Sequence, residues 1–431
     1  MFEISVAEMG LMLLIVTGIG GFFMAFTIGA NDVANSFASA VGAKAITIKQ
    51  AVAIAGLMNI LGAVILGGNV SMTLITGIIN PGNFASPDQY VLAMISILLA
   101  AAVFVFCSTV LGLPVSTTHA LIGSLTGLAI FVAGWDSVNW GMMISIAITW
   151  VASPLIAALF SYLLVWFIQK SIVGDGGAGS IVRIKRVVPY IIGLTMGILL
   201  YFFLNAGALR RFKEFEVWEI VVLLAIVCPY TVLISQGLVT FWCNRVSDNL
   251  EGVESVFQRL QVGTSSYVAF AQGANDVANA ISPLFAVFLV VQLHGLPSEV
   301  GDYSVPIWIL ILGGAGIAAG IGILGHRVIS TLGERLTPLT NTRGFSVDFS
   351  VATTVVAASM AGIPVSSSHA ATGAVVGVGL YRGVKSVNFG ILGGIFVAWI
   401  VTLPIAAVVA VGIFQLLNVI FALPEPVTPP M

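Results

Sequence analysis

The heptapeptide GANDVAN occurs twice in this chain, at residues 29–35 and at residues 273–279. Each copy carries one aspartate, Asp32 or Asp276, and the first lies beside a run of apolar residues long enough to sit inside a lipid bilayer. An ionisable side chain is costly in such a setting, and it usually marks a functional site. The repetition indicates that the chain uses two such groups together.

The composition is that of an integral membrane protein. Hydrophobic residues make up 58% of the 431 residues and charged residues only 8%, whereas a soluble domain carries about 25% charged residues. We therefore predict an all-α polytopic membrane protein with about 12 transmembrane segments, because a stretch of about 20 apolar residues can span a bilayer as a helix. The candidate segments lie near residues 9–37, 51–76, 91–113, 120–133, 141–169, 187–206, 217–241, 261–290, 306–325, 349–363, 368–380 and 388–421.

The repeat extends well beyond the heptapeptide. PVSTTHA at residues 114–120 returns as PVSSSHA at residues 364–370. Further matches follow in the same order: Gly123 and Gly127 return as Gly373 and Gly377, and Trp150 returns as Trp399. Internal repeats of this size are common in transporters. We predict a first repeat over 1–169, connecting helices and cytoplasmic linkers over 170–260, and a second repeat over 261–431.

Loop charges predict how the two halves are oriented. Basic loops stay on the cytoplasmic side of a membrane, and three pairs of equivalent loops carry opposite charge. The first-half loops carry Lys44 and Lys49, Asp88, and Asp136, whereas their counterparts carry Glu299 and Asp302, Arg335 and Arg343, and Arg382 and Lys385. This pattern predicts inverted-topology repeats in the cell membrane, with both termini extracytoplasmic. The basic loop at 209–216 is an exception, because it would then lie outside.

The loops at 77–90 and 134–139 are predicted to lie on the same side, although two apolar segments and PVSTTH separate them. The chain must therefore enter the membrane and return. A re-entrant or broken helical hairpin fits this requirement, with PVSTTH at or near the bend. Non-helical backbone at membrane depth is tolerated where it lines a cavity or is buried in protein.

The GANDVAN motifs are candidate cation sites. Asp32 and Asn35 are three residues apart and share one face of a helix. Their carboxylate and amide oxygens are hard ligands, suited to a small cation such as Na⁺ or to a proton. The candidate cation-binding residues are Asn31, Asp32, Asn35, Asn275, Asp276 and Asn279. The structural alternative is an aspartate that is hydrogen-bonded only for helix packing.

The PVSTTH and PVSSSH motifs are candidate anion sites. Proline followed by hydroxyl residues is typical of a helix start, and a helix N-terminus offers unpaired N–H groups that bind oxyanions. The candidate phosphate-binding residues are Ser116, Thr117, Thr118, Ser366, Ser367 and Ser368. The structural alternative is hydroxyl bonding to the preceding helical turn. His119 and His369 could donate to the anion, carry protons or fix the hairpin.

Charge balance favours an anion that travels together with cations. An oxyanion beside Asp32 and Asp276 would be repelled, and no Lys or Arg lies within the motifs. Bound cations would compensate, and each ligand would then favour binding of the other. Outside the motifs, Asn59 is interpreted as a polar contact between helices. Residues 251–259 are predicted to form an amphipathic helix at the membrane interface, just before the second half.

At these paired motifs the chain resembles the inorganic phosphate transporter family, and LTPLTNTRGF at residues 336–345 adds to the resemblance. The resemblance implies a symporter of inorganic phosphate that is coupled to Na⁺ or H⁺, with inverted repeats and a homodimeric assembly. We favour Na⁺ over H⁺ and expect alternating access around a site near the membrane midplane. It matches Asp32, Asn35, Asp276 and Asn279 to cation-linked positions, and Ser116, Thr117, Ser366 and Ser367 to anion-facing ones. The large central loop of eukaryotic members is absent, which is typical of a prokaryotic-type member.

Other functions remain to be compared with this one. A permease for sulfate or another oxyanion with the same fold is the main alternative. An intramembrane hydrolase using Ser116 and His119 would need one asymmetric nucleophile, and two equivalent copies argue against it. A channel would need no paired aspartate sites. We therefore expect no enzyme activity, no organic cofactor and no nucleic-acid partner, with phosphate, Na⁺ and the lipid bilayer as the partners.

Overall fold

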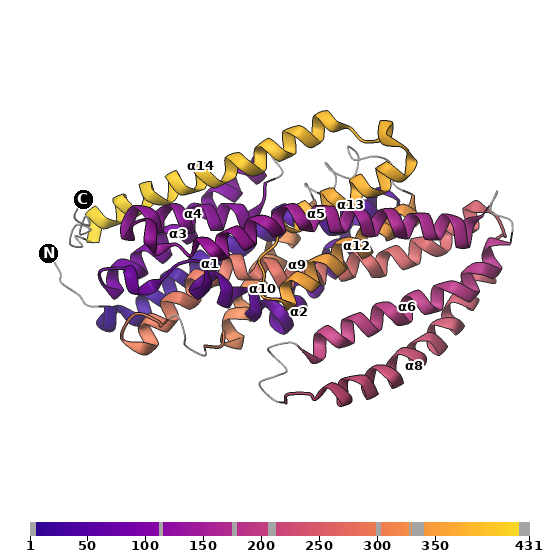
Figure 1. The fold of residues 1–431 in the computed structure, drawn as a ribbon, viewed down its shortest axis with the longest axis horizontal. Coiled ribbons are helices and arrows are strands. Elements are labelled where there is room, and N and C mark those ends of the chain that lie inside the picture. The colour runs from indigo at the N-terminus through magenta and orange to yellow at the C-terminus, as the bar shows by residue number, and fades with distance from the viewer. Residues whose placement is uncertain are drawn as a thin grey trace.

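The computed structural model describes residues 6–111, 115–174, 179–205, 213–298, 303–326, 329 and 340–421. Within these ranges the chain forms twelve α-helices and no β-strand. Nine of the helices are long and apolar enough to cross a membrane, which confirms the predicted helical membrane protein (Figure 1). Several positions used above lie outside the described ranges: the first residue of PVSTTHA, the start of the basic loop (209–212), Glu299, Asp302, Arg335 and residues 336–339.

The helices follow the predicted apolar segments closely. They are α1 (Val6–Gly42), α2 (Ile48–Met72), α3 (Pro87–Val110), α4 (Thr117–Ala133), α5 (Trp140–Ile168), α6 (Ser180–Leu204), α8 (Val217–Cys243), α9 (Leu250–Leu293), α10 (Ile307–Gly320), α12 (Asn341–Met360), α13 (Ser367–Arg382) and α14 (Phe389–Phe421).

Local capping explains several helix starts. The Thr47 side chain accepts from Gln50 N–H in a capping box at the start of α2, and Ser86 caps α3 in front of Pro87. These side chains bind N–H groups that have no partner within the first helical turn. Polar residues in the loops therefore determine the residue at which each of these apolar helices begins.

The predicted α3–α4 hairpin is confirmed. Ile79 and Val138 form an isolated antiparallel bridge, and Asn139 N–H donates to the Ile78 carbonyl at 2.8 Å. The loop before α3 and the loop after α4 therefore meet at the same end of the molecule. In the second half α12 packs on α13 in the same way. α12 begins at Asn341 and has 20 residues, so this segment is longer than the sequence suggested.

The tips of the two hairpins meet. The rings of His119 on α4 and His369 on α13 lie 4.6 Å apart, centroid to centroid. From this meeting point α4 and α13 extend toward opposite ends of the molecule (Figure 1). The same succession of elements flanks both hairpin helices, because a 3-10 turn follows each, Trp135–Ser137 and Val384–Ser386, and leads into the long helices α5 and α14.

Glycines at matching positions let the halves pack on each other. A Cβ at Gly29 on α1 would lie 2.0 Å from the carbonyl oxygen of Ile317 on α10, and one at Gly273 on α9 would lie 2.1 Å from that of Asn59 on α2. Such spacing requires glycine, as is common where membrane helices approach closely. Each GANDVAN helix thus packs on a helix of the other half in the same way. The two-repeat organisation and the inverted topology stay predictions.

The amphipathic helix predicted at 251–259 is present, but it forms the first turns of α9 and does not stop before the motif. Helix α9 is continuous over 44 residues from Leu250, and Val253, Val256 and Phe257 are buried against neighbouring helices. Their burial joins this segment to the body of the protein, so that the helix does not stop before the motif. The boundary proposed between 260 and 261 therefore falls inside α9.

Helices α6 and α8 pack against each other along one edge of the molecule (Figure 1). Asp248 ties the loops at their ends, because its carboxylate accepts from Gly179 N–H at 2.8 Å and from Ile181 N–H at 3.0 Å. The bonds to the Ile181 and Gly179 N–H groups hold the pKa of Asp248 below its usual range. The cores that carry the motifs lie elsewhere, one including α1, α3, α4 and α9 and a second including α9, α12 and α13.

Candidate functional site

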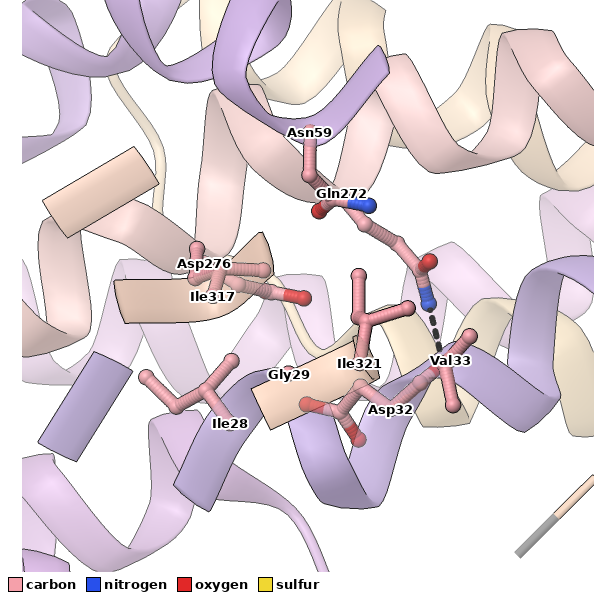
Figure 2. A pocket seen from close by; sticks show the side chains of 9 residues that line it. All are labelled: Ile28, Gly29, Asp32, Val33, Asn59, Gln272, Asp276, Ile317 and Ile321. Atoms are coloured by element: carbon pink, nitrogen blue, oxygen red, sulfur yellow. Dashed lines mark hydrogen bonds between the residues drawn. The ribbon is translucent and has the colours of Figure 1, made fainter. Parts of the chain in front are cut away.

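Asp32 on α1 and Asp276 on α9 line one small pocket in the interior (Figure 2). Their exposed fractions are 3% and 1%. The full lining is Ile28, Gly29, Asp32, Val33, Asn59, Gln272, Asp276, Ile317 and Ile321. The two motifs, which are far apart in sequence, are therefore brought together, and both aspartates line one pocket that has no Lys or Arg in its lining.

The hairpin motifs form helix starts, as predicted. Ser116 is the N-cap of α4 and accepts from His119 N–H at 3.2 Å. Ser366 is the N-cap of α13 and accepts from His369 N–H at 3.3 Å. Both capping residues have extended backbone dihedrals, and both are buried. Two helix N-termini therefore lie inside the protein, where their free N–H groups and positive dipole ends favour an anion.

The second hydroxyl of each motif contacts a carboxylate of its own half. Thr117 Oγ1 donates to Asp32 Oδ2 at 3.2 Å, and Ser367 Oγ donates to Asp276 Oδ2 at 3.0 Å. The candidate anion and cation residues therefore form one continuous polar cluster. From the sequence we predicted separate anion and cation sites, whereas direct side-chain hydrogen bonds join the two sets of residues.

The third hydroxyl of each motif contacts the other half. Asn35 Nδ2 donates to Ser368 Oγ at 2.9 Å, and Asn279 Nδ2 donates to Thr118 Oγ1 at 3.1 Å. Asn35 also contacts Asp32 Oδ1 at 3.4 Å. Each hairpin tip is thus held by both GANDVAN helices, one through a carboxylate and one through an amide.

The first asparagines of the two motifs are placed differently. Asn31 Nδ2 donates to Thr109 Oγ1 on α3 at 2.8 Å. Asn275 Nδ2 donates to Asp276 Oδ1 and to the Val365 carbonyl, each at 2.7 Å. Asn275 therefore belongs to the polar cluster around its aspartate, whereas Asn31 ties α1 to α3. Sequence identity between the motifs does not make every position equivalent.

The histidines hold the hairpins against the long helices. His119 Nδ1 lies 3.0 Å from the Trp399 carbonyl and His369 Nδ1 lies 3.1 Å from the Trp150 carbonyl. Each ring also packs on an indole, His119 on Trp150 at 4.0 Å and His369 on Trp399 at 3.5 Å between centroids. A carbonyl only accepts hydrogen bonds, so each Nδ1 is the protonated nitrogen. These contacts favour hairpin fixation among the three predicted roles.

Two buried polar residues were missed by the sequence analysis. Gln272 lines the pocket, and its Nε2 donates to the Asp32 backbone carbonyl at 2.8 Å. Asp348 on α12 is 1% exposed and accepts from Ser39 at 2.9 Å and from Ser265 at 2.5 Å. Gln272 directly precedes the second motif, so a polar side chain next to GANDVAN could have pointed to it in the sequence. Asp348 belongs to no repeated motif, and it lies at the edge of an apolar segment.

Comparison with known proteins identifies the family. The phosphate transporter family model matches residues 28–410. A phosphate permease of Thermococcus kodakarensis, so described by its name, is 43% identical over 94% of this chain and 98% of its own length. A similarly named permease of Haemophilus influenzae is 36% identical over 96% of this chain and 99% of its own length.

A chloroplastic inorganic phosphate transporter of Arabidopsis thaliana is 33% identical over 91% of this chain and 70% of its own length. A solved structure titled as the sodium-dependent phosphate transporter superposes with a TM-score of 0.88 at 38% identity, covering 95% of this chain and all of that one. The matched proteins are transporters and not enzymes. The match of motifs, chain length and fold leads to one conclusion: this chain belongs to the phosphate transporter family.

Proposed function

We propose that this chain is a symporter that carries inorganic phosphate together with Na⁺, through a site near the membrane midplane. The pair of contacts Thr117–Asp32 and Ser367–Asp276 carries the proposal. Each contact joins an anion-facing hydroxyl to a cation-facing carboxylate, so that an ion bound by one group changes the environment of the other. Coupling of this kind is what a symporter requires.

The anion would bind between the two hairpin tips. Helices α4 and α13 both begin in the interior, and His119 and His369 on their first turns are in ring contact. Backbone N–H groups and hydroxyls from both helices can then surround one tetrahedral anion. Phosphate is the anion named by the family and by its relatives. The hydroxyls would turn from the carboxylates toward phosphate as it enters.

Cations would make this binding possible. Asp32 and Asp276 line the same pocket, and no Lys or Arg is among the lining residues. Phosphate beside two carboxylates is favourable only when positive charge is bound with it. Na⁺ prefers oxygen ligands of the kind found here, and the superposed structure is titled as sodium-dependent. These observations support Na⁺ over H⁺ as the coupling ion.

Alternating access would proceed by movement of one part of the helical bundle around this central site, as in other transporters built from repeats. We further propose a homodimer in the cell membrane, with both chain termini on its extracytoplasmic side. The loop charges of the described residues support this orientation, because the first-half loop with Lys44 and Lys49 is basic, whereas the first-half loops with Asp88 and Asp136 carry no Lys or Arg.

Uptake of radiolabelled phosphate into proteoliposomes tests the proposal. An inward Na⁺ gradient is compared with an inward H⁺ gradient, and sulfate is added as a competitor. We expect uptake driven by Na⁺ that sulfate does not inhibit. Uptake driven only by H⁺ would recast the two aspartates as proton carriers. Full competition by sulfate would instead assign the chain as a permease for a wider group of oxyanions.

A further inference from the structure

We propose that Asn59 and Gln272 join Asp32 and Asp276 in binding one Na⁺. The equivalent positions of the repeats do not supply matching amides, so this Na⁺ site is asymmetric. The inference deepens the proposed function, and it rests on that function. All four residues line the same pocket (Figure 2). Together they offer carboxylate and amide oxygens, which are hard ligands for a small cation.

The two repeats do not contribute equally to this pocket. Gln272 directly precedes the second GANDVAN, and the residue in the same place before the first is Ile28. Asn59 packs its backbone on Gly273, and the residue that packs on the matching Gly29 is Ile317. Two amides therefore stand where the equivalent positions hold two isoleucines. A site that followed the symmetry of the repeats would have amides at both pairs of positions. Here only one pair carries amides, so only that part of the pocket can bind a cation through amide oxygens.

Hydrogen bonds fix the orientation of both amides. Gln272 Nε2 donates to the Asp32 carbonyl at 2.8 Å, and Asn59 Nδ2 donates to the Ala55 carbonyl at 2.9 Å. A carbonyl accepts only, so the nitrogen of each amide must face it. Within the described part of the chain, neither amide oxygen accepts a hydrogen bond. Both oxygens are left available to a ligand, although Gln272 is 2% exposed and Asn59 3%.

Position and charge select the occupant. None of the hairpin-tip hydroxyl residues lines this pocket, so the anion position proposed above lies beside the pocket and not in it. The lining carries two carboxylates and no basic side chain. Buried carboxylates that share a space repel each other unless a cation lies between them. A cation here would relieve that repulsion and so favour phosphate at the adjoining hairpin tips.

The occupant is tested by removing the amide oxygens while keeping the shape of each side chain. Gln272→Met and Asn59→Leu replace each amide with an apolar side chain of similar size. Gln261→Met is the matched control, because Gln261 lies on the same helix and is fully buried but does not line the pocket. Phosphate uptake is measured against Na⁺ concentration, and ²²Na⁺ binding is measured without phosphate.

We expect each of the two pocket variants to raise the Na⁺ concentration for half-maximal uptake roughly tenfold or more, the scale of one lost contact to a charged group. Uptake at saturating Na⁺ should recover, and ²²Na⁺ binding without phosphate should weaken in parallel. Gln261→Met should leave both quantities unchanged. Asn59→Leu keeps the test valid if Gln272→Met does not fold, because the Asn59 hydrogen bond stays within its own helix.

Unchanged Na⁺ dependence in the pocket variants, with Na⁺-driven uptake in the unmodified chain, would overturn this inference alone. A rise in the half-maximal Na⁺ concentration in Gln261→Met as large as in the pocket variants would also overturn it, because the effect would then be general to helix α9. Absence of any Na⁺ dependence in the unmodified chain would overturn the proposed function and, with it, this site.

Discussion

Short polar side chains control the centre of this protein. Thr117 and Ser367 each reach a carboxylate, and Thr118 and Ser368 each receive an amide from the other half. All four residues are short, so every contact depends on how closely the hairpins approach α1 and α9. Removing one of these hydroxyl groups should therefore reduce transport strongly, whereas a substitution that keeps the hydroxyl should change transport little.

Asp32→Asn should abolish coupled phosphate uptake while the protein remains folded. The substitution keeps the shape of the side chain and removes a negative charge that cations would neutralise. Proteoliposome uptake under a Na⁺ gradient is the measurement. Asp136→Asn, in an exposed turn, is the control and should transport normally. Full transport by Asp32→Asn with the same cation dependence would refute the assignment of Asp32.

Thr117→Val should reduce phosphate uptake by roughly tenfold or more, because a hydrogen bond to a charged group contributes about 1.5–3 kcal/mol. Valine has the shape of threonine without its hydroxyl. Thr117→Ser keeps the hydroxyl that donates to Asp32 and should retain most of the activity. Comparable uptake by the valine and serine variants would show that the hydroxyl has no part in transport.

At the scale of helices, the two GANDVAN helices work because they pack closely on their neighbours. Gly273 allows α9 to approach the Asn59 carbonyl on α2, and Gly29 allows α1 to approach the Ile317 carbonyl on α10. The histidine and tryptophan rings then hold α4 and α13 against α14 and α5. Helix spacing therefore sets the distances between the polar groups.

Gly273→Ala should destabilise the protein by about 1–3 kcal/mol, the usual cost of overpacking. The added Cβ would lie 2.1 Å from the Asn59 carbonyl oxygen, which is backbone and cannot turn aside. Gly263→Ala is the matched control, because it lies on the same helix with no atom within 4 Å of the added Cβ. Thermal unfolding in detergent should show a lower Tm for the first variant only.

At the scale of the whole molecule, the outer helices expose large apolar side chains. Many large apolar side chains are exposed on α8, including Val217 at 79% and Leu233 at 70%. Exposure of this kind suits a bilayer, where the backbone is satisfied within each helix and apolar side chains meet lipid. The polar cluster lies far from this surface, enclosed by α1, α9 and the hairpins. The molecule is thus apolar on the outside and polar in its centre.

Cysteine labelling should find the turns after the two hairpin helices on opposite sides of the membrane. The turn after α4 holds Asp136 and the turn after α13 holds Lys385, and both side chains are exposed. In a background without Cys107, Cys228 and Cys243, Asp136→Cys should react from outside intact cells and Lys385→Cys only after permeabilisation. Labelling of both from the same side would refute the inverted topology.

The sequence by itself determined the class of the protein and its main candidate residues. Low charge and long apolar runs require helices in a bilayer, because each backbone group must be satisfied within its own segment. The duplicated motifs singled out Asp32 and Asp276, since a costly charge is rarely repeated without a function. Placement of the loops at 77–90 and 134–139 on the same side predicted the hairpin that Ile79 and Val138 close.

Only the tertiary structure decided how these residues meet. Periodicity along one helix cannot show that Asn35 contacts Ser368 or that Asn279 contacts Thr118, because those contacts cross between the halves. Gln272 and Asn59 lie outside the repeated motifs, and helix packing alone places them beside the carboxylates. Burial likewise makes α9 continuous through the predicted boundary. Local sequence sets each helix, whereas close packing between helices sets the site.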